Sequence, residues 1–156
     1  MSVLLHEDFT FMVQGITGRE AVNLTRECLD YGSRVVGGVT PGRKGREVHG
    51  VPVFDTVEQA VEHHGSPPNG AVATVPPAFT KDAVFEAIEN GIELVVIVTE
   101  RIPRGDVAQM VELAGTRGMR SVTITMILTP FSRASKTASL VNAGGTVTTE
   151  PSIGLP

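Results

Sequence analysis

Short apolar runs alternate along this chain with stretches whose apolar residues recur at helical spacing. The first run, Phe11–Gln14, stops at a glycine, and a helical pattern then continues to Tyr31. Buried strands are predicted at Arg34–Val39, Ala71–Val75 and Leu94–Val98, with a short extended piece at His49–Phe54. Further helices are predicted at Val57–His64, from Thr80 or Lys81 to Asn90, and over Val107–Leu113. This alternation predicts an α/β fold: a Rossmann-like, doubly wound and mainly parallel sheet in a single domain.

The turn after the first strand carries two glycines, Gly15 and Gly18. Glycine lets the backbone turn sharply and lets a ligand approach the main chain closely. The N–H groups at the start of the next helix lack helical partners, and with the positive end of the helix dipole they suit a phosphate. The alternative interpretation is a turn that joins strand to helix and binds nothing.

A cationic loop follows the second predicted strand. Its basic residues are Arg43, Lys44 and Arg46, and glycines flank them. Because the carboxyl ends of parallel strands form the ligand-binding edge of such a sheet, one interpretation is a second phosphate site beside the glycine loop. The other interpretation is a solvated surface loop. After the next short strand, Asp55 or Thr56 is expected to cap a helix.

The third and fourth predicted strands also end in distinctive residues. Pro76 and Pro77 fix a rigid loop after the third strand. Thr99 and Glu100, after the fourth, can receive hydrogen bonds from the ribose or base of a ligand. The alternative for Glu100 is a solvated carboxylate, or an ion pair with one of the arginines that follow it.

Composition narrows the class of protein. A length of 156 residues predicts one domain, and a net charge of −4 with a pI near 5.5 argues against a general nucleic-acid binder. The single cysteine, Cys28, permits no internal disulfide and is interpreted as a small apolar helix residue. The adjacent His63 and His64 point in different directions on a helix, so no metal site is predicted. Since no apolar run approaches membrane-spanning length, a cytoplasmic protein is expected.

The region after the second strand distinguishes between nucleotide ligands. A dinucleotide dehydrogenase places an acidic residue there to hold the ribose hydroxyls, whereas this chain has the glycines of Val35–Gly38 and then the cationic loop. Coenzyme A, which carries a 3′-phosphate and a pyrophosphate, fits this pattern. NADP fits less well, and an oxidoreductase is disfavoured.

Seven motifs then carry a family resemblance: Gln14–Gly18, Tyr31–Gly32, Val36–Gly42, Gly50–Phe54, Val75–Phe79, Glu86–Ile88 and Thr99–Pro103. In this order, over about residues 1 to 120, they resemble the amino-terminal domain of the alpha subunit of succinyl-CoA synthetase. The resemblance implies a domain that binds coenzyme A. It places Thr17, Gly18, Arg19 and Glu20 at the phosphate loop, Arg43 as a cation for CoA, and Val98, Thr99 and Glu100 against the coenzyme. The candidate cofactor-binding set also includes Gly15, Pro41, Lys44, Val75 and Pro76, and no catalytic residue is assigned.

The chain departs from the family pattern in three places. Arg19 and Glu20 stand where the family has small or amide residues, and Arg43 replaces a lysine while keeping its charge. After Gly118 the sequence diverges. Residues 1–120 are therefore assigned to the CoA-binding part, and residues 121–156 to a divergent C-terminal strand and tail of the same domain. An alternating strand is expected from Ser121 to Pro130, and Phe131–Leu140 is expected to form either an added helix or a loop.

The resemblance also implies a division of labour. The family joins a carboxylic acid to CoA through an acyl phosphate and a phosphohistidine in a second domain, and none of the four histidines matches that residue. We therefore expect a CoA-binding subunit or module that is inactive alone and presents CoA to an ATP-grasp beta-type partner. The alternatives are a non-catalytic sensor of CoA, acyl-CoA or a related nucleotide, and a remnant that folds without binding. A homo-oligomer is the alternative to a beta-type partner.

Overall fold

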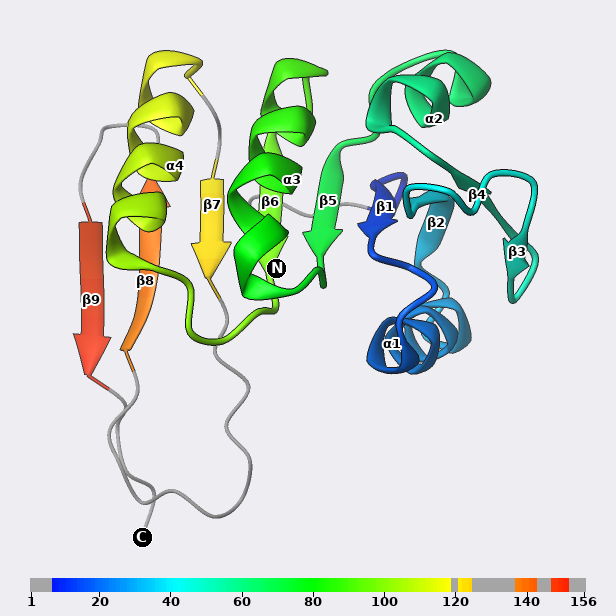
Figure 1. Ribbon diagram of the computed structural model, residues 1–156, viewed down its shortest axis with the longest axis horizontal. Coiled ribbons are helices and arrows are strands. Elements are labelled where there is room, and N and C mark those ends of the chain that lie inside the picture. Colours follow the sequence, from blue (N-terminus) through cyan, green and yellow to red (C-terminus); the bar gives the residue numbers. More distant parts are fainter. Residues whose placement is uncertain (1–6, 119–120, 125–136, 143–146, 152–156) are drawn as a thin grey trace, which may run out of the picture.

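The computed structural model describes residues 7–118, 121–124, 137–142 and 147–151. The strands within these residues are β1 (Thr10–Gln14), β2 (Arg34–Val39), β3 (Glu47–Val48), β4 (Val51–Phe54), β5 (Gly70–Ala73), β6 (Leu94–Ile97), β7 (Ser121–Ile124), β8 (Thr137–Asn142) and β9 (Val147–Pro151). The helices are α1 (Arg19–Asp30), α2 (Val57–His64), α3 (Pro77–Glu89) and α4 (Arg104–Thr116). Figure 1 shows their arrangement.

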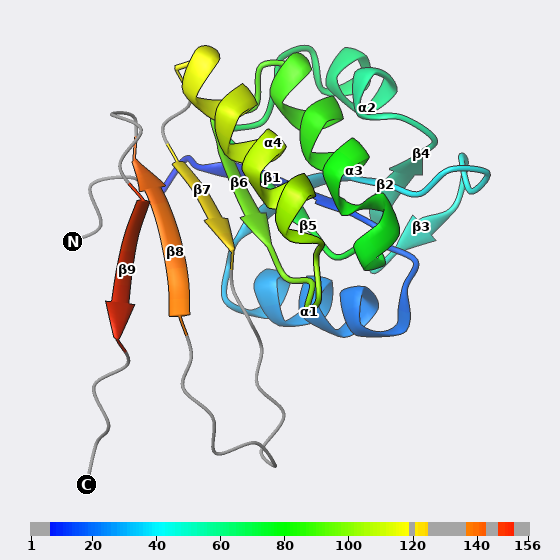
Figure 2. The same cartoon turned by 60° about the vertical axis from the view of Figure 1, so that its left-hand side comes forward.

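All the strands join one sheet, in the order β3-β4-β2-β1-β5-β6-β7-β8-β9. The run from β4 to β7 is parallel throughout, whereas β3 pairs antiparallel with β4 at one edge. At the other edge β8 and β9 add antiparallel strands beyond β7 (Figure 2). The predicted Rossmann-like, mainly parallel α/β sheet is confirmed. Its strand order reverses between β1 and β5, and in such sheets ligands bind at that point.

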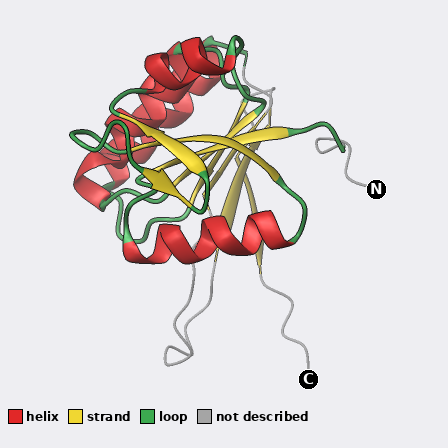
Figure 3. Cartoon of the chain, turned by 90° about the vertical axis from the view of Figure 1, so that its right-hand side faces the viewer, coloured by secondary structure: helices red, strands yellow, loops and turns green. Residues whose placement is uncertain are grey.

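Helices cover both faces of the sheet, with α1 on one face and α2, α3 and α4 on the other (Figure 3). The larger core lies under the three helices and includes Met12, Val84, Val95, Ile97 and Met110, all of them nearly inaccessible to solvent. The smaller core lies under α1 and includes Val13, Ile16, Ala21 and Val53. Alternate residues of β1, such as Met12 and Val13, therefore face opposite cores. No helix of the described residues has the length and apolar character needed to cross a membrane.

Two helix starts differ from the sequence-based prediction. The helix expected from Thr80 or Lys81 begins at Pro77, with Pro76 as its N-cap. Proline is well suited to the first helical position, because the N–H that it lacks would have no helical partner there. Helix α4 likewise begins at Arg104, after Pro103, rather than at Val107. Both helices are therefore one turn longer at the end that approaches the ligand-binding edge of the sheet.

The C-terminal expectations are met in part. The predicted strand is confirmed from Ser121 to Ile124, while its continuation to Pro130 lies outside the described residues. Residues 131–136 also lie outside them. The remaining residues, 137–140, belong to strand β8, so for these both the helix and the loop were wrong. Leu140 pairs with Thr123 of β7, and this long-range partner gave no local signal in the sequence.

Candidate functional site

A cavity of about 1010 Å³ opens where the strand order reverses. Its walls come from the residues that follow β1, β2, β5 and β6 and from one side of α3. These segments lie at the carboxyl ends of parallel strands, the edge at which the sequence places the ligand.

The glycine loop forms the floor of this cavity beside β1. Gly15 has a φ of +81°, a conformation that other residues rarely adopt, and its N–H donates to the Val39 carbonyl at 2.7 Å. A Cβ at Gly15 would lie 3.1 Å from the side chains of both Thr74 and Val75. A glycine is therefore required where the loop passes between the ends of β2 and β5.

Helix α1 begins at this loop without a side-chain cap. Its N-cap is Gly18, which has no side chain to accept a hydrogen bond from the first turn. The first N–H groups of a helix have no partners within it, and they carry the positive end of the helix dipole. Since Gly18 itself lines the cavity, this end of α1 offers backbone donors to an anionic ligand.

Two further contacts hold the glycine loop against β2 and the residue that follows it. The buried side chain of Ile16 packs directly on Gly38, where a Cβ would lie only 2.4 Å from the Ile16 Cδ1 atom. The hydroxyls of Thr17 and Thr40 are 3.2 Å apart and hydrogen-bonded. The glycine at position 38 therefore makes room for the loop, and Thr40 fixes its far side.

The opposite wall, from the ends of β5 and β6, is held by threonine hydroxyls that point back to the main chain. Thr74 donates to the Gln14 carbonyl and Thr99 donates to the Val75 carbonyl, each at 2.8 Å. Between them Val75, Pro76 and Val98 line the cavity with apolar surface. This wall therefore suits an uncharged part of a ligand.

The cationic loop is ordered by an acidic residue. The Asp55 Oδ1 atom accepts from the backbone N–H groups of Arg43, at 3.0 Å, and of Lys44, at 3.1 Å. Both basic side chains are exposed and neither lines the cavity, whereas Pro41 of the same loop does. Asp55, expected from the sequence as one of two possible helix caps, thus positions this loop instead. The cap is Thr56, whose Oγ1 accepts from the Gln59 N–H at 3.2 Å.

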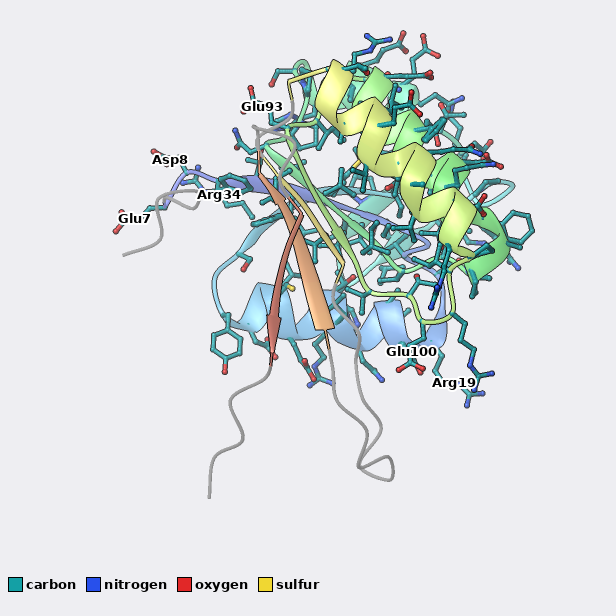
Figure 4. All side chains as sticks on the ribbon, turned by 90° about the vertical axis from the view of Figure 1, so that its left-hand side faces the viewer. Glu7, Asp8, Arg19, Arg34, Glu93 and Glu100 are labelled. Atoms are coloured by element: carbon teal, nitrogen blue, oxygen red, sulfur yellow. The ribbon has the colours of Figure 1, made fainter. Side chains whose placement is uncertain are left out.

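Most of the predicted site residues meet in the cavity wall, namely Gly15, Thr17, Gly18, Glu20, Pro41, Val75, Pro76, Val98, Thr99 and Glu100. Arg19, Arg43 and Lys44 are not part of that wall. Arg19 points outward from the start of α1 into solvent, while Glu100 comes from the loop after β6 (Figure 4). The cations that the sequence associates with phosphate thus lie outside the cavity.

The charged residues in the cavity wall are mostly acidic. The lining residues include one arginine, Arg101, and four carboxylates: Glu20, Asp82, Glu86 and Glu100. One of these carboxylates has a structural partner, since Glu86 Oε1 accepts from the Val57 N–H at 2.8 Å. This balance favours neutral, hydrogen-bond-donating ligand groups inside the cavity and phosphates at the glycine loop and the rim.

Sequence reasoning missed one face of α3. Phe79, Asp82, Ala83 and Glu86 all line the cavity, and their spacing of three and four residues puts them on one side of a helix. Because the predicted helix began three residues too late, Phe79 was assigned to a loop and this pattern was not seen. Gln14 was also not singled out. It is nearly fully buried, and its Nε2 donates to the Ala83 carbonyl at 2.7 Å.

The cysteine lies away from this site. Cys28 is half-buried on α1 and does not line the cavity. Burial, together with the nearby Glu27 carboxylate, raises the pKa of its thiol, which reduces the fraction of reactive thiolate at neutral pH. The residues described hold no cluster of side chains that could bind a metal ion.

A family model described as "CoA binding domain" matches residues 6–101, well over half of the chain. The chain belongs to the CoA-binding domain family. This membership confirms coenzyme A as the expected cofactor.

Curated relatives confirm the resemblance drawn from the motifs. The succinate–CoA ligase [ADP-forming] subunit alpha of Aquifex aeolicus is 48% identical over 106 residues, covering 68% of this chain and 34% of the relative. The corresponding subunit of Methanothermobacter thermautotrophicus is 46% identical, covering 74% of this chain and 39% of the relative. An ADP-forming sulfoacetate-CoA ligase subunit of Bilophila wadsworthia is 41% identical, covering 70% and 37%. The chain thus spans between 34% and 39% of the length of these relatives.

Solved structures share the fold at low sequence identity. An ATP citrate lyase from Methanothrix soehngenii, in complex with citrate and coenzyme A, matches with a TM-score of 0.63 and 16% identity, covering 86% of this chain and 23% of the other. A dihydrodipicolinate reductase from Paenisporosarcina matches with a TM-score of 0.61 and 14% identity, covering 75% and 46%. Both similarities concern the Rossmann-like architecture alone.

Proposed function

We propose that this chain is the CoA-binding module of an acid–CoA ligase and that it holds coenzyme A in the cavity at the carboxyl edge of the sheet. One observation carries the proposal. In a chain of the CoA-binding family, the uncapped N-terminus of α1 and the Gly15–Gly18 loop open directly into a cavity of about 1010 Å³. That end of α1 supplies backbone donors for a pyrophosphate.

The charges around the cavity support a placement for the other parts of the coenzyme. The 3′-phosphate is directed toward the exposed Arg43 and Lys44, whose loop is held by Asp55 beside the end of β2. The uncharged pantetheine arm is directed along Val75 and Val98, on the other side of β1, where the wall is apolar and its hydroxyls are already bonded. This orientation keeps the phosphates away from Asp82 and Glu86 of α3, whereas Glu20, in the first turn of α1, lies beside the pyrophosphate and opposes its binding.

The role of the chain within a ligase is to position CoA for chemistry supplied elsewhere. Among the described histidines, His49, His63 and His64 do not line the cavity, so none is placed to carry a phosphoryl group to the coenzyme. Since the matched segment covers only 34% of the length of one relative and 39% of another, we propose that acid activation and phosphoryl transfer reside in a further domain or in an ATP-grasp beta-type partner.

Isothermal titration of the purified chain with CoA, 3′-dephospho-CoA and NADP tests this proposal. We expect CoA to bind most tightly and 3′-dephospho-CoA to bind about ten- to hundredfold more weakly, the loss that follows removal of charged hydrogen bonds. Preference for NADP would overturn the proposal in favour of an oxidoreductase-type site. Absence of binding for all three would mean that the fold is kept without the site.

A further inference from the structure

Two large hydrophobic side chains are conspicuously exposed in the part of the chain that the structure describes. Tyr31, at the end of α1, is 92% exposed, and Phe79, in the first turn of α3, is 61% exposed. Phe79 lines the cavity and Tyr31 does not. The ring of Phe79 therefore presents apolar surface at a site where a ligand would cover it.

Phe79 lines the cavity together with apolar residues of a second wall. Phe79 belongs to α3, which follows β5, whereas Pro41 and Val39 belong to β2 and its loop on the other side of β1. In doubly wound sheets the nucleoside part of a ligand lies near the end of the strand that corresponds to β2. A base bound there has apolar residues of both segments within the same cavity.

The charges along α3 favour a base over a phosphate at this position. Asp82 and Glu86 follow Phe79 at helical spacing on the same side of α3, and both line the cavity. The Asp82 carboxylate repels a phosphate but can accept a hydrogen bond from an exocyclic amine, which adenine carries, whereas Glu86 already accepts from the Val57 N–H. The base is uncharged at neutral pH, so it is the part of a nucleotide that this wall tolerates.

We propose that Phe79 is the base-recognition residue of the cavity and that its ring stacks on the purine of the bound nucleotide. The inference rests on the proposed function, in which that purine is the adenine of coenzyme A. In this role Phe79 contributes to affinity for the nucleotide half of the ligand. Its exposure in the first turn of α3 leaves the ring accessible, so no rearrangement of the core is needed for stacking.

Titration calorimetry of four proteins tests this role: the unaltered chain, Phe79→Ala, Phe79→Tyr and Tyr31→Ala. The probes are CoA and adenosine 3′,5′-bisphosphate, which has the base and phosphates without the pantetheine arm. Phe79→Ala is expected to weaken both probes by the same factor, about five- to hundredfold, as expected for loss of one base–aromatic stack. Phe79→Tyr restores binding because it keeps the ring. Tyr31→Ala, the matched exposed aromatic outside the cavity, leaves both affinities unchanged.

Each contrary outcome has a distinct meaning. If the unaltered chain binds CoA and Phe79→Ala binds it equally well, the stacking role is overturned while the proposed function stands. If Phe79→Ala weakens CoA but not adenosine 3′,5′-bisphosphate, Phe79 contacts the pantetheine arm and the inference is again overturned. If the unaltered chain binds neither probe, the proposed function fails and the stacking role fails with it. Should Phe79→Ala not fold, Phe79→Leu keeps an apolar side chain without a ring and gives the same comparison.

Discussion

The N-termini of α1 and α2 lie on the same edge of the sheet. The N–H groups in the first turn of α2 are hydrogen-bonded to side chains, whereas α1 has no side-chain cap. In α2 the first turn is closed, since Thr56 Oγ1 accepts from the Gln59 N–H and Glu86 Oε1 accepts from the Val57 N–H. In α1 the N-cap is Gly18, which supplies no acceptor, and the helix opens into the cavity. Both helix N-termini carry N–H groups without helical partners and the positive end of a helix dipole, but only the N-terminus of α1 leaves these donors available to a ligand.

This difference indicates where an anion is to bind. A side-chain cap at the N-terminus of a helix adds stability but occupies the donors that a phosphate would need. Helices α3 and α4 also begin without a side-chain cap, after Pro76 and Pro103, so a missing cap alone does not mark a ligand site. At α1 the missing cap coincides with a glycine loop at the floor of the cavity, and proline occupies neither its N-cap nor its first position. The acidic cavity wall makes that coincidence more informative, because a phosphate has few other partners inside.

The largest expected effect on CoA affinity comes from adding a side-chain cap to α1, like the one that α2 has. Gly18→Asp places a carboxylate at the N-cap, where it accepts from the first turn and repels the pyrophosphate. A hypothetical Cβ at Gly18 meets only the Gly15 carbonyl oxygen closely, at 3.2 Å, and φ is −67°, so the fold is expected to survive. Since like-charge juxtaposition costs several kcal/mol, CoA affinity should fall at least about a hundredfold in titration calorimetry.

Two control variants separate charge from capping in this experiment. Gly18→Asn caps α1 without a negative charge, and its CoA affinity should lie between those of Gly18→Asp and the unaltered chain. Gly105→Asp adds the same charge to the first turn of α4, where a Cβ has no close neighbour, and should leave binding unchanged. Undiminished CoA binding by Gly18→Asp would remove the α1 terminus from the phosphate site.

The cationic loop gives the next largest effect and tests whether side chains supplement the backbone donors. Arg43→Ala should weaken CoA binding by about 1–3 kcal/mol, the range for a hydrogen bond to a charged group. The same substitution should leave 3′-dephospho-CoA binding nearly unchanged, because the phosphate that we propose for Arg43 is then missing. Arg117→Ala, at the C-terminal end of α4, serves as the control for net charge. An equal loss for both ligands would assign Arg43 to the pyrophosphate instead.

The comparison between the two helices also shows how far sequence reasoning reaches. The glycine loop and the Thr56 cap were predictable, since each depends on residues within one turn of the feature that they form. The Glu86 contact to Val57 was not, because it joins residues 29 positions apart on different helices. Asp55 shows the same limit. Its local sequence favours a helix cap, yet it binds the N–H groups of a loop that precedes it by 11 and 12 residues.

Removing the side-chain cap of α2 should lower the free energy of unfolding and leave CoA affinity unchanged. Thr56→Ala removes the side-chain acceptor for the Gln59 N–H and should lower the free energy of unfolding by about 0.5–2 kcal/mol in urea titrations. CoA affinity should remain as in the unaltered chain, because Thr56 does not line the cavity. Thr56→Ser, which keeps the hydroxyl, is the matched control. A loss of CoA affinity on Thr56→Ala would show that the α2 terminus also contributes to the ligand site.

The smallest effect is expected at the residue that belongs to both regions. Glu86 accepts a hydrogen bond from the first turn of α2 and also lines the cavity. Glu86→Gln keeps an oxygen for the Val57 N–H but removes the negative charge from both the helix end and the cavity wall. Losing a carboxylate beside a helix N-terminus should lower the free energy of unfolding by about 0.3–1 kcal/mol, and the difference should shrink at high salt. CoA affinity should rise slightly, since one carboxylate fewer faces the ligand. Glu58→Gln, in the exposed first turn of α2, should reproduce the stability change without the gain in affinity. A fall in affinity for Glu86→Gln would instead mean that the carboxylate receives a hydrogen bond from the ligand, and that the same residue is used for both folding and recognition.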